Sequence, residues 1–105
     1  MIMIARLWHG QAATAANADA YFQHVTGTVF PSLEDLAGHR GAWLLRRDAD
    51  SRTEFLAITL WESRQAIEAF AGRDIDKANV EPEGRAVLAE FDDFARHYEV
   101  VFRTP

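Results

Sequence analysis

Two short stretches near the ends of the chain carry side chains that could move a proton and hold a charge. "ARLWHG" contains Arg6 and Trp8, and "ARHYEVV" contains His97 and Glu99. Histidine exchanges a proton near neutral pH, and an arginine held in a dry cavity stabilises a developing negative charge. Together they would suit removal of a proton from a phenol or enol, which leaves an electron-rich anion. We therefore assign His97 and Arg6 as candidate catalytic residues, with Glu99 orienting one of them.

The elements that must position these residues follow from the hydrophobic pattern. Apolar residues at spacings of three and four predict helices, and runs of β-branched and aromatic residues predict strands. We expect strands at 2–9, 42–48, 53–62 and 95–102, a first helix from Asn17 to Gly38 that Pro31 bends or restarts, a second at 64–71 capped by Ser63, and a third from Pro82 to Phe91. The order β-α-β-β-α-β predicts an α+β, ferredoxin-like fold with a four-stranded antiparallel sheet, in a single domain spanning residues 1–105.

The expected strand order brings the two ends of the chain together. Right-handed crossovers place the first and third strands in the centre of the sheet, with both helices on one face. The first strand then lies between the third and fourth, so Arg6 is expected near Ala57 on one side and near Glu99 on the other. His97 is expected near Trp8.

The face on which these side chains lie depends on the alternation of the last strand. In one alternation a single pocket faces the helices, lined by Arg6, Trp8, His97, Glu99 and Trp61 around the small residues Ala57 and Thr59. In the other, His97 and Glu99 turn to the opposite face and Tyr98 enters the pocket. Two ordinary alternatives also stand: Trp61 as core packing, and Arg6 with Glu99 as a cross-strand ion pair worth about 0.2–1 kcal/mol.

The stretch "FLAITLWES" is apolar on both alternations, although an open sheet face should be polar. If Phe55 and Trp61 face the helices, then Leu56, Ile58 and Leu60 face outward. Exposing such a patch costs about 25 cal/mol per Å² of apolar surface, and patches of this kind usually mark an interface. We therefore predict a homodimer with twofold symmetry, in which two sheets pack face to face as a dimeric α/β barrel.

Three stretches together resemble a known family. "FLAITLWESRQAIEAFAG", the opening "ARLWHG" and the closing "HYEVV" are similar to the antibiotic biosynthesis monooxygenase (ABM) family of small dimeric α/β-barrel proteins. This resemblance implies a ligand between the sheet and its helices. The family includes enzymes that oxidise polycyclic phenols or quinols with molecular oxygen and without flavin or metal, and it also includes haem-degrading proteins.

The resemblance transfers to individual residues only in part. Trp61 matches the pocket tryptophan of the cofactor-free phenol oxidases, but their asparagine and tyrosine correspond to Ala57 and Ile67. The asparagine, tryptophan and histidine of the haem degraders correspond to Arg6, Phe70 and about Val80. The resemblance therefore favours chemistry without haem, and we expect no cofactor.

The amino-acid composition limits the classes of molecule that the protein is expected to bind. The chain has 105 residues, a net charge of −5 and eleven scattered basic residues, which argues against nucleic-acid binding. It has no cysteine, no pair of histidines at metal-ligand spacing, and no apolar run long enough for a membrane helix. We expect a cytoplasmic protein with no metal and no membrane partner.

The sequence thus predicts a cofactor-independent monooxygenase acting on a small aromatic or quinol-type molecule. The expected substrate-binding residues are Trp61, Trp8, Glu99, Phe70, Tyr21 and His24. Two alternatives remain open, namely a ligand-binding or accessory dimer without turnover, and an isomerase or cyclase that transfers protons in the same pocket.

Overall fold

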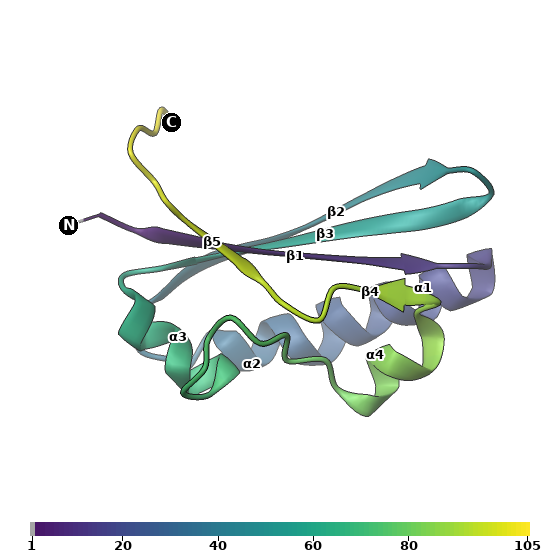
Figure 1. Cartoon of the computed structure of the whole chain (residues 1–105), viewed down its shortest axis with the longest axis horizontal. Helices are drawn as coiled ribbons and strands as arrows, with labels where there is room; N and C mark the ends of the chain where they lie inside the picture. Colours follow the sequence, from purple (N-terminus) through teal and green to yellow (C-terminus); the bar gives the residue numbers. More distant parts are fainter. Residues whose placement is uncertain (1) are drawn as a thin grey trace.

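One antiparallel sheet with helices against one of its faces makes up the structure, a computed structural model that describes residues 2–105 (Figure 1). The elements in chain order are β1 (Ile4–Ala12), α1 (Ala15–His24), the π-helix η1 (Val25–Val29), α2 (Phe30–Leu33), β2 (His39–Ala49), β3 (Arg52–Trp61), α3 (Arg64–Ala71), α4 (Pro82–Val87), β4 (Glu90–Phe91) and β5 (Arg96–Glu99). The strand order is β2-β3-β1-β4, and β5 also pairs with β1. The predicted α+β, ferredoxin-like fold is confirmed. None of the helices described is long and apolar enough to cross a membrane.

The β2–β3 hairpin forms as expected and is longer than predicted. Its turn has Asp50 and Ser51 at φ values of 51° and 66°. Positive φ at both central residues is typical of a type I′ hairpin turn, whose backbone twist matches that of the paired strands. Ten residue pairs then run in register from Ala49 opposite Arg52 to His39 opposite Trp61, with one irregularity between His39 and Gly41.

The first helical segment differs from the prediction at its start. Thr14, not Asn17, caps α1, and its hydroxyl accepts a hydrogen bond from the backbone N–H of Asn17 at 3.1 Å. The helix continues through the wider turn of η1 and resumes as α2 around Pro31. Proline has no backbone N–H to donate, so the expected restart at this residue is confirmed.

The C-terminal third differs more. Helix α4 ends at Val87, and Phe91, expected in this helix, lies in β4 opposite Gly10 of β1. The expected strand at 95–102 pairs only as β5, over residues 96–99, opposite Leu7 to Ile4 of β1, and β4 pairs with the other end of β1. The chain then leaves the sheet on the side away from the helices (Figure 1), with Val101 and Phe102 exposed.

The core between sheet and helices is divided in two. One cluster of buried side chains surrounds Trp8, Tyr21 and Phe55, and the other surrounds Trp61 and Ile67. Phe30, from α2, packs against both clusters. A division of this kind leaves room for a cavity where the two clusters meet.

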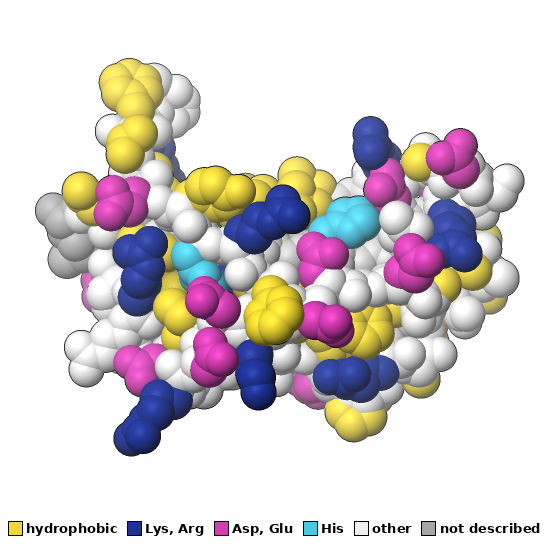
Figure 2. Space-filling model, in the orientation of Figure 1, with side chains coloured by type: hydrophobic (Ala, Val, Ile, Leu, Met, Phe, Trp, Pro, Cys, Tyr) yellow, Lys and Arg dark blue, Asp and Glu magenta, His cyan; other side chains and the backbone are white. Residues whose placement is uncertain are grey.

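The face away from the helices is apolar and largely uncovered. Trp43 and Leu45 of β2 are 45% and 48% exposed, and they pair with Ile58 and Leu56 of β3, which are half-buried. Leu60, expected on this patch, is instead buried within the chain itself. Hydrophobic side chains along the upper edge of the molecule in Figure 2 belong to this open side and to the C-terminal segment.

Candidate active site

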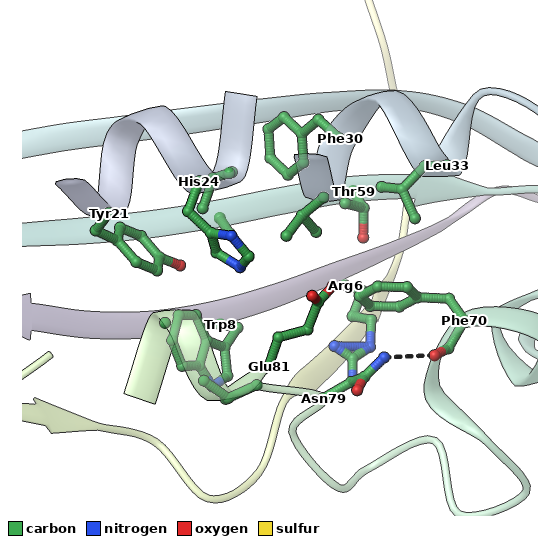
Figure 3. A pocket seen from close by; sticks show the side chains of 15 residues that line it. Arg6, Trp8, Tyr21, His24, Phe30, Leu33, Thr59, Phe70, Asn79 and Glu81 are labelled. Carbon is green, nitrogen blue, oxygen red and sulfur yellow. Dashed lines mark hydrogen bonds between the residues drawn. The ribbon is translucent and has the colours of Figure 1, made fainter. Parts of the chain in front are cut away.

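A cavity of about 70 Å³ lies between the sheet and the helices. The sheet supplies its floor through Arg6, Trp8, Ala57 and Thr59. The other walls come from Tyr21, His24, Val25, Val29, Phe30, Leu33, Phe70, Asn79, Val80, Glu81 and Gly84 (Figure 3). The lining is therefore mainly aromatic and aliphatic with a few polar groups, as is usual for small-molecule sites.

Arg6 is the buried cation of this cavity, with 5% of its surface exposed. Its Nη2 donates to the carbonyl oxygens of Ile75 and Lys77 at 3.2 and 2.9 Å, and its guanidinium carbon lies 5.5 Å from the centre of the Phe70 ring. Its Nε is buried without a hydrogen-bond partner among residues 2–105. Burial lowers the pKa of Arg6 to about 10, although the Asp76 carboxylate acts in the opposite direction. Keeping this charge at neutral pH costs on the order of 3 kcal/mol of folding free energy, a pattern common at functional sites.

Trp61 does not line the cavity, contrary to the prediction. It is fully buried behind the cavity wall, and its indole Nε1 donates to the hydroxyl oxygen of Thr59 at 2.8 Å. Thr59 is the residue that faces the cavity. Trp61 is a packing residue, as one of the sequence-based alternatives held, and it supports two cavity residues, Thr59 through this hydrogen bond and Phe70 through ring stacking.

His97 and Glu99 also lie outside the cavity, and the register of the last strand differs from the prediction by two residues. Arg6 stands opposite Thr59 and His97, and Glu99 stands opposite Ile4. His97 does lie beside Arg6, but its Nδ1 is 3.1 Å from the carboxylate of Asp76. Glu99 is exposed near the end of the sheet.

The remaining predicted residues lie at the cavity. Trp8, Tyr21, His24 and Phe70 all line it together with Arg6. The indole Nε1 of Trp8 donates to the Asp92 carbonyl at 2.7 Å, so this ring is fixed and offers its surface rather than its N–H. Burial raises the pKa of Tyr21, which keeps its hydroxyl protonated.

Two polar residues at the cavity were not foreseen. Asn79, whose Nδ2 donates to the carbonyl oxygen of Phe70 at 2.6 Å, and Glu81 both line it. Figure 3 shows the Glu81 carboxylate and the His24 imidazole directed toward the same space. One potential ligand atom from each of His24, Glu81 and the exposed Glu83 lies within 4.8 Å of the others, so a divalent cation could fit here.

No local signal in the sequence placed Asn79 and Glu81. Both lie in the irregular segment between α3 and α4, where periodicity gives no direction to a side chain. The segment reaches the cavity because two of its carbonyl groups accept hydrogen bonds from Arg6. Only Pro82, which predicts a helix start, indicated that Glu81 would lie at a helix end.

The arrangement places proton acceptors and a fixed positive charge around one apolar space. His24 and Glu81 can accept a proton, and Arg6 can hold the negative charge that results. The aromatic walls offer flat surfaces to a ring. The cavity is thus suited to ionising a small aromatic molecule.

Comparison with known proteins agrees with this architecture. The sequence model of the family described as antibiotic biosynthesis monooxygenase matches residues 2–81. A Bacillus cereus structure assigned to the antibiotic biosynthesis monooxygenases superposes with a TM-score of 0.68 at 15% identity, covering 100% of this chain and 99% of that one. No match was found among curated proteins.

Two further structures carry ligands. The haem-degrading protein MhuD of Mycobacterium tuberculosis, with two haems in its active site, superposes with a TM-score of 0.65 at 18% identity over 97% of this chain and 99% of that one. The ActVA-Orf6 monooxygenase of Streptomyces coelicolor, in complex with nanaomycin D, gives 0.59 at 14% identity over 99% and 90%. At these identities the likeness shows a shared fold.

Proposed function

The chain belongs to the antibiotic biosynthesis monooxygenase family, and on that premise we propose that it is a cofactor-independent monooxygenase of a small aromatic or quinol-type molecule. The observation that carries the proposal is Arg6, a buried cation beside an aromatic-walled cavity with no carboxylate of the described chain within ion-pairing distance. A cation of this kind favours a ligand that becomes an anion.

The reaction requires little from the protein beyond ionisation and positioning. A phenol or enol loses one proton, and the resulting anion is electron-rich enough to reduce dioxygen. For a ring methylene activated by a neighbouring enol, one oxygen atom of O₂ ends on carbon as a carbonyl and the other leaves as water with the two methylene hydrogens. Atoms and electrons balance without an external reductant, because the substrate carbon is itself oxidised by four electrons.

The structure changes the residue proposed as the base. His97 lies outside the cavity, so His24 and Glu81 become the proton acceptors, each presented to the cavity by a different element. Arg6 keeps the role of stabilising the anion. General-base and charge-stabilising contributions of this kind are each typically about 100-fold or more in rate.

The volume of the cavity limits the size of the substrate that the protein can bind. The cavity of about 70 Å³ is roughly half the size of the engineered ~150 Å³ cavity that binds benzene. The walls must therefore move apart to admit a ring. Residues 72–81 form the side wall with the least regular structure, so we expect this segment to move.

Haem does not fit this cavity. At the position where the resemblance places the iron ligand, Val80 lines the wall with an aliphatic side chain. The cavity is also far smaller than a porphyrin needs. The role of MhuD is therefore not transferred to this chain.

The direct test is oxygen consumption by the purified protein with single-ring quinols, hydroxylated naphthalenes and anthrones. We expect substrate-dependent uptake that falls roughly 100-fold in Arg6→Gln and in His24→Gln or Glu81→Gln. His97→Gln is the matched control and should retain uptake, since this histidine lies outside the cavity. Saturable ligand binding with no oxygen consumption would instead support the non-catalytic binding dimer.

Removal of metals provides a second test. The proposed chemistry needs no metal ion, so treatment with EDTA should leave oxygen uptake unchanged. Loss of uptake that is restored by one divalent cation, and abolished by Glu83→Gln, would contradict the proposal. It would assign the reaction to a metal held by His24, Glu81 and Glu83.

A proton-transfer enzyme is the second candidate. Tyr21 and His24 lie one helical turn apart, and Figure 3 shows the Tyr21 hydroxyl pointing toward the imidazole of His24. An acid and a base so placed could move a proton between two positions of one ligand. Isomerisation of an enolisable ligand under nitrogen, lost in Tyr21→Phe, would favour this candidate.

We also propose a second copy of this chain as the protein partner. The uncovered apolar side of the sheet and the exposed C-terminal Val101 and Phe102 support a homodimer formed through this side.

A further inference from the structure

We propose that the cavity binds an ionised aryl oxygen between Arg6 and Thr59, and that Trp61 is the positioning residue that directs the Thr59 hydroxyl toward it. The inference rests on the proposed function only in taking this cavity as the ligand site. It specifies the charge of the ligand and the place of its oxygen.

Arg6 and Thr59 are neighbouring residues of the sheet, and each carries a hydrogen-bond donor. They stand directly opposite each other on β1 and β3, so their side chains lie on the same face of the sheet. Arg6 is 5% exposed and Thr59 is 6% exposed, and both line the cavity. The Nε of Arg6 has no hydrogen-bond partner among residues 2–105.

The contact with Trp61 determines what Thr59 can do. An indole N–H can only donate, so Thr59 Oγ1 must be the acceptor in this 2.8 Å bond. The hydroxyl proton remains free to donate, and the Thr59 hydroxyl donates no hydrogen bond within the described part of the chain. Buried donors of this kind are rarely left unsatisfied. The nearest open space is the cavity.

Charge decides which ligand oxygen is favoured. Both Arg6 Nε and the Thr59 hydroxyl are donors, so the oxygen between them has to accept twice. An ionised aryl oxide accepts two bonds without placing a proton between donors, whereas a neutral phenol must direct its own proton elsewhere. Two carboxylates lie near Arg6, but neither forms an ion pair with it: Asp76 bonds to His97 and is mostly exposed, and Glu81 lines the cavity as a proton acceptor.

The pair therefore favours the ionised form of a bound phenol, which is the form that reacts with dioxygen. Arg6 supplies the positive charge, the Thr59 hydroxyl orients the aryl oxygen by donating a hydrogen bond to it, and Trp61 fixes the rotamer of Thr59. Trp61 touches no ligand. Its contribution depends on Thr59 being present.

The probe is 4-nitrophenol, whose neutral and ionised forms absorb at different wavelengths. Titration of the wild-type protein across pH should show the ionised form bound preferentially, with the pKa of the bound phenol lowered by about one unit or more. Arg6→Gln should weaken binding of the ion roughly 10- to 100-fold, and Thr59→Val roughly 10-fold, in keeping with hydrogen bonds to charged groups. Thr59→Ser keeps the hydroxyl and should remain within about threefold of wild type.

The role of Trp61 is tested through non-additivity. Trp61→Phe removes the N–H and keeps an aromatic ring, and it should weaken ion binding and partly restore the ordinary pKa of the probe. In a Thr59→Val background the same change should have no further effect on the probe, because the bond it supports is already absent. Circular dichroism and unfolding of each variant separate a binding loss from a folding loss, and Tyr98→Phe, at an exposed position outside the cavity, serves as the control with unchanged binding.

Three results would overturn the inference: preferential binding of neutral 4-nitrophenol or none, wild-type affinity in Thr59→Val, or additive effects of Trp61→Phe and Thr59→Val. Its failure differs from failure of the proposed function. If the protein binds ionised 4-nitrophenol but consumes no oxygen with any quinol, the proposed monooxygenase activity is contradicted and the proposed aryl oxide site is supported. If the protein consumes oxygen but shows no preference for the ionised probe, the aryl oxide site is contradicted and the monooxygenase activity is supported.

Discussion

His39 and His97 make the stability of the protein depend on pH. Burial lowers the pKa of both below the ordinary value of 6.5, and for His97 the charge of Arg6 acts in the same direction. The unfolded chain then binds protons more readily than the folded chain as the pH falls below about 6.5. The free energy of unfolding should therefore be greatest above this value and decrease as the solution is acidified.

We expect His97→Gln to reduce this pH dependence. Denaturant unfolding at pH 7.5 and at pH 5.5 gives the difference in unfolding free energy for each protein, and the difference should be smaller in the variant. Tyr98→Phe, at the exposed neighbouring position, is the control that should keep the wild-type difference. An identical difference in His97→Gln and wild type would show that His97 is not the group responsible.

At the residue scale, the sequence predicts the strand residues of the cavity better than the loop residues. The alternation of β1 placed Arg6 and Trp8 on the helix-facing side, and the structure confirms that side for both. The predicted pairing of the last strand with β1 is wrong by two residues. The prediction places Glu99 opposite Arg6, whereas the structure has His97 there. Register depends on where β4 and β5 share the edge of β1, and this is a property of the tertiary structure.

At the scale of elements, η1 offers a test of how the helical layer is built. Gly27 lies in this exposed π-helical turn, and a Cβ added there would meet no atom within 4 Å. Gly27→Ala should stabilise the protein by up to about 1 kcal/mol, because alanine loses less conformational freedom in a helix. Thermal or chemical unfolding measures the change.

Gly38 is the contrasting position. Its φ is +86°, and a Cβ there would lie 2.6 Å from the Cβ of Ala66 in α3. Gly38→Ala should therefore destabilise the protein by roughly 1–3 kcal/mol. Equal effects of the two substitutions would mean that the turn into β2 is not held as described.

The segment 72–81 is the element that should respond to a ligand. It is held by the Arg6 bonds to two carbonyls, by Asn79 on the Phe70 carbonyl and by two backbone bonds to residues 93–95, without a regular helix or strand of its own. Segments with few backbone bonds open at low free energy. Amide hydrogen exchange in this segment should slow when 4-nitrophenol is bound, while exchange in β2 at the far edge stays unchanged.

Elements with strong local signals were predicted well. The hairpin follows from its turn, and α3 follows from Ser63, whose hydroxyl accepts from the N–H of Ala66 at 3.1 Å as a cap should. The split of the last strand into β4 and β5 had no such signal. It arises because the chain between the two strands pairs with the segment that covers Arg6: the N–H of Ala95 donates to the Asp76 carbonyl, and the N–H of Ala78 donates to the Asp93 carbonyl.

For the whole molecule, the open side of the sheet leads to a prediction about assembly. Trp43→Asp, at the centre of the exposed apolar side, should convert a dimer to a monomer in analytical ultracentrifugation at micromolar concentration. Phe22→Asp, on the exposed side of α1, is the matched control and should stay dimeric. Wild-type protein that sediments as a stable folded monomer would rule out the proposed partner.

The central claim is that the space between sheet and helices receives an aromatic anion, with its oxygen at Arg6 and Thr59. A crystal structure of the protein soaked with 4-nitrophenol, at a pH where the free probe is ionised, tests this claim directly. We predict the ring against Phe70 and the aryl oxygen within hydrogen-bond distance of both Arg6 Nε and Thr59 Oγ1. A ring bound elsewhere, or its oxygen directed away from Arg6, would contradict the claim.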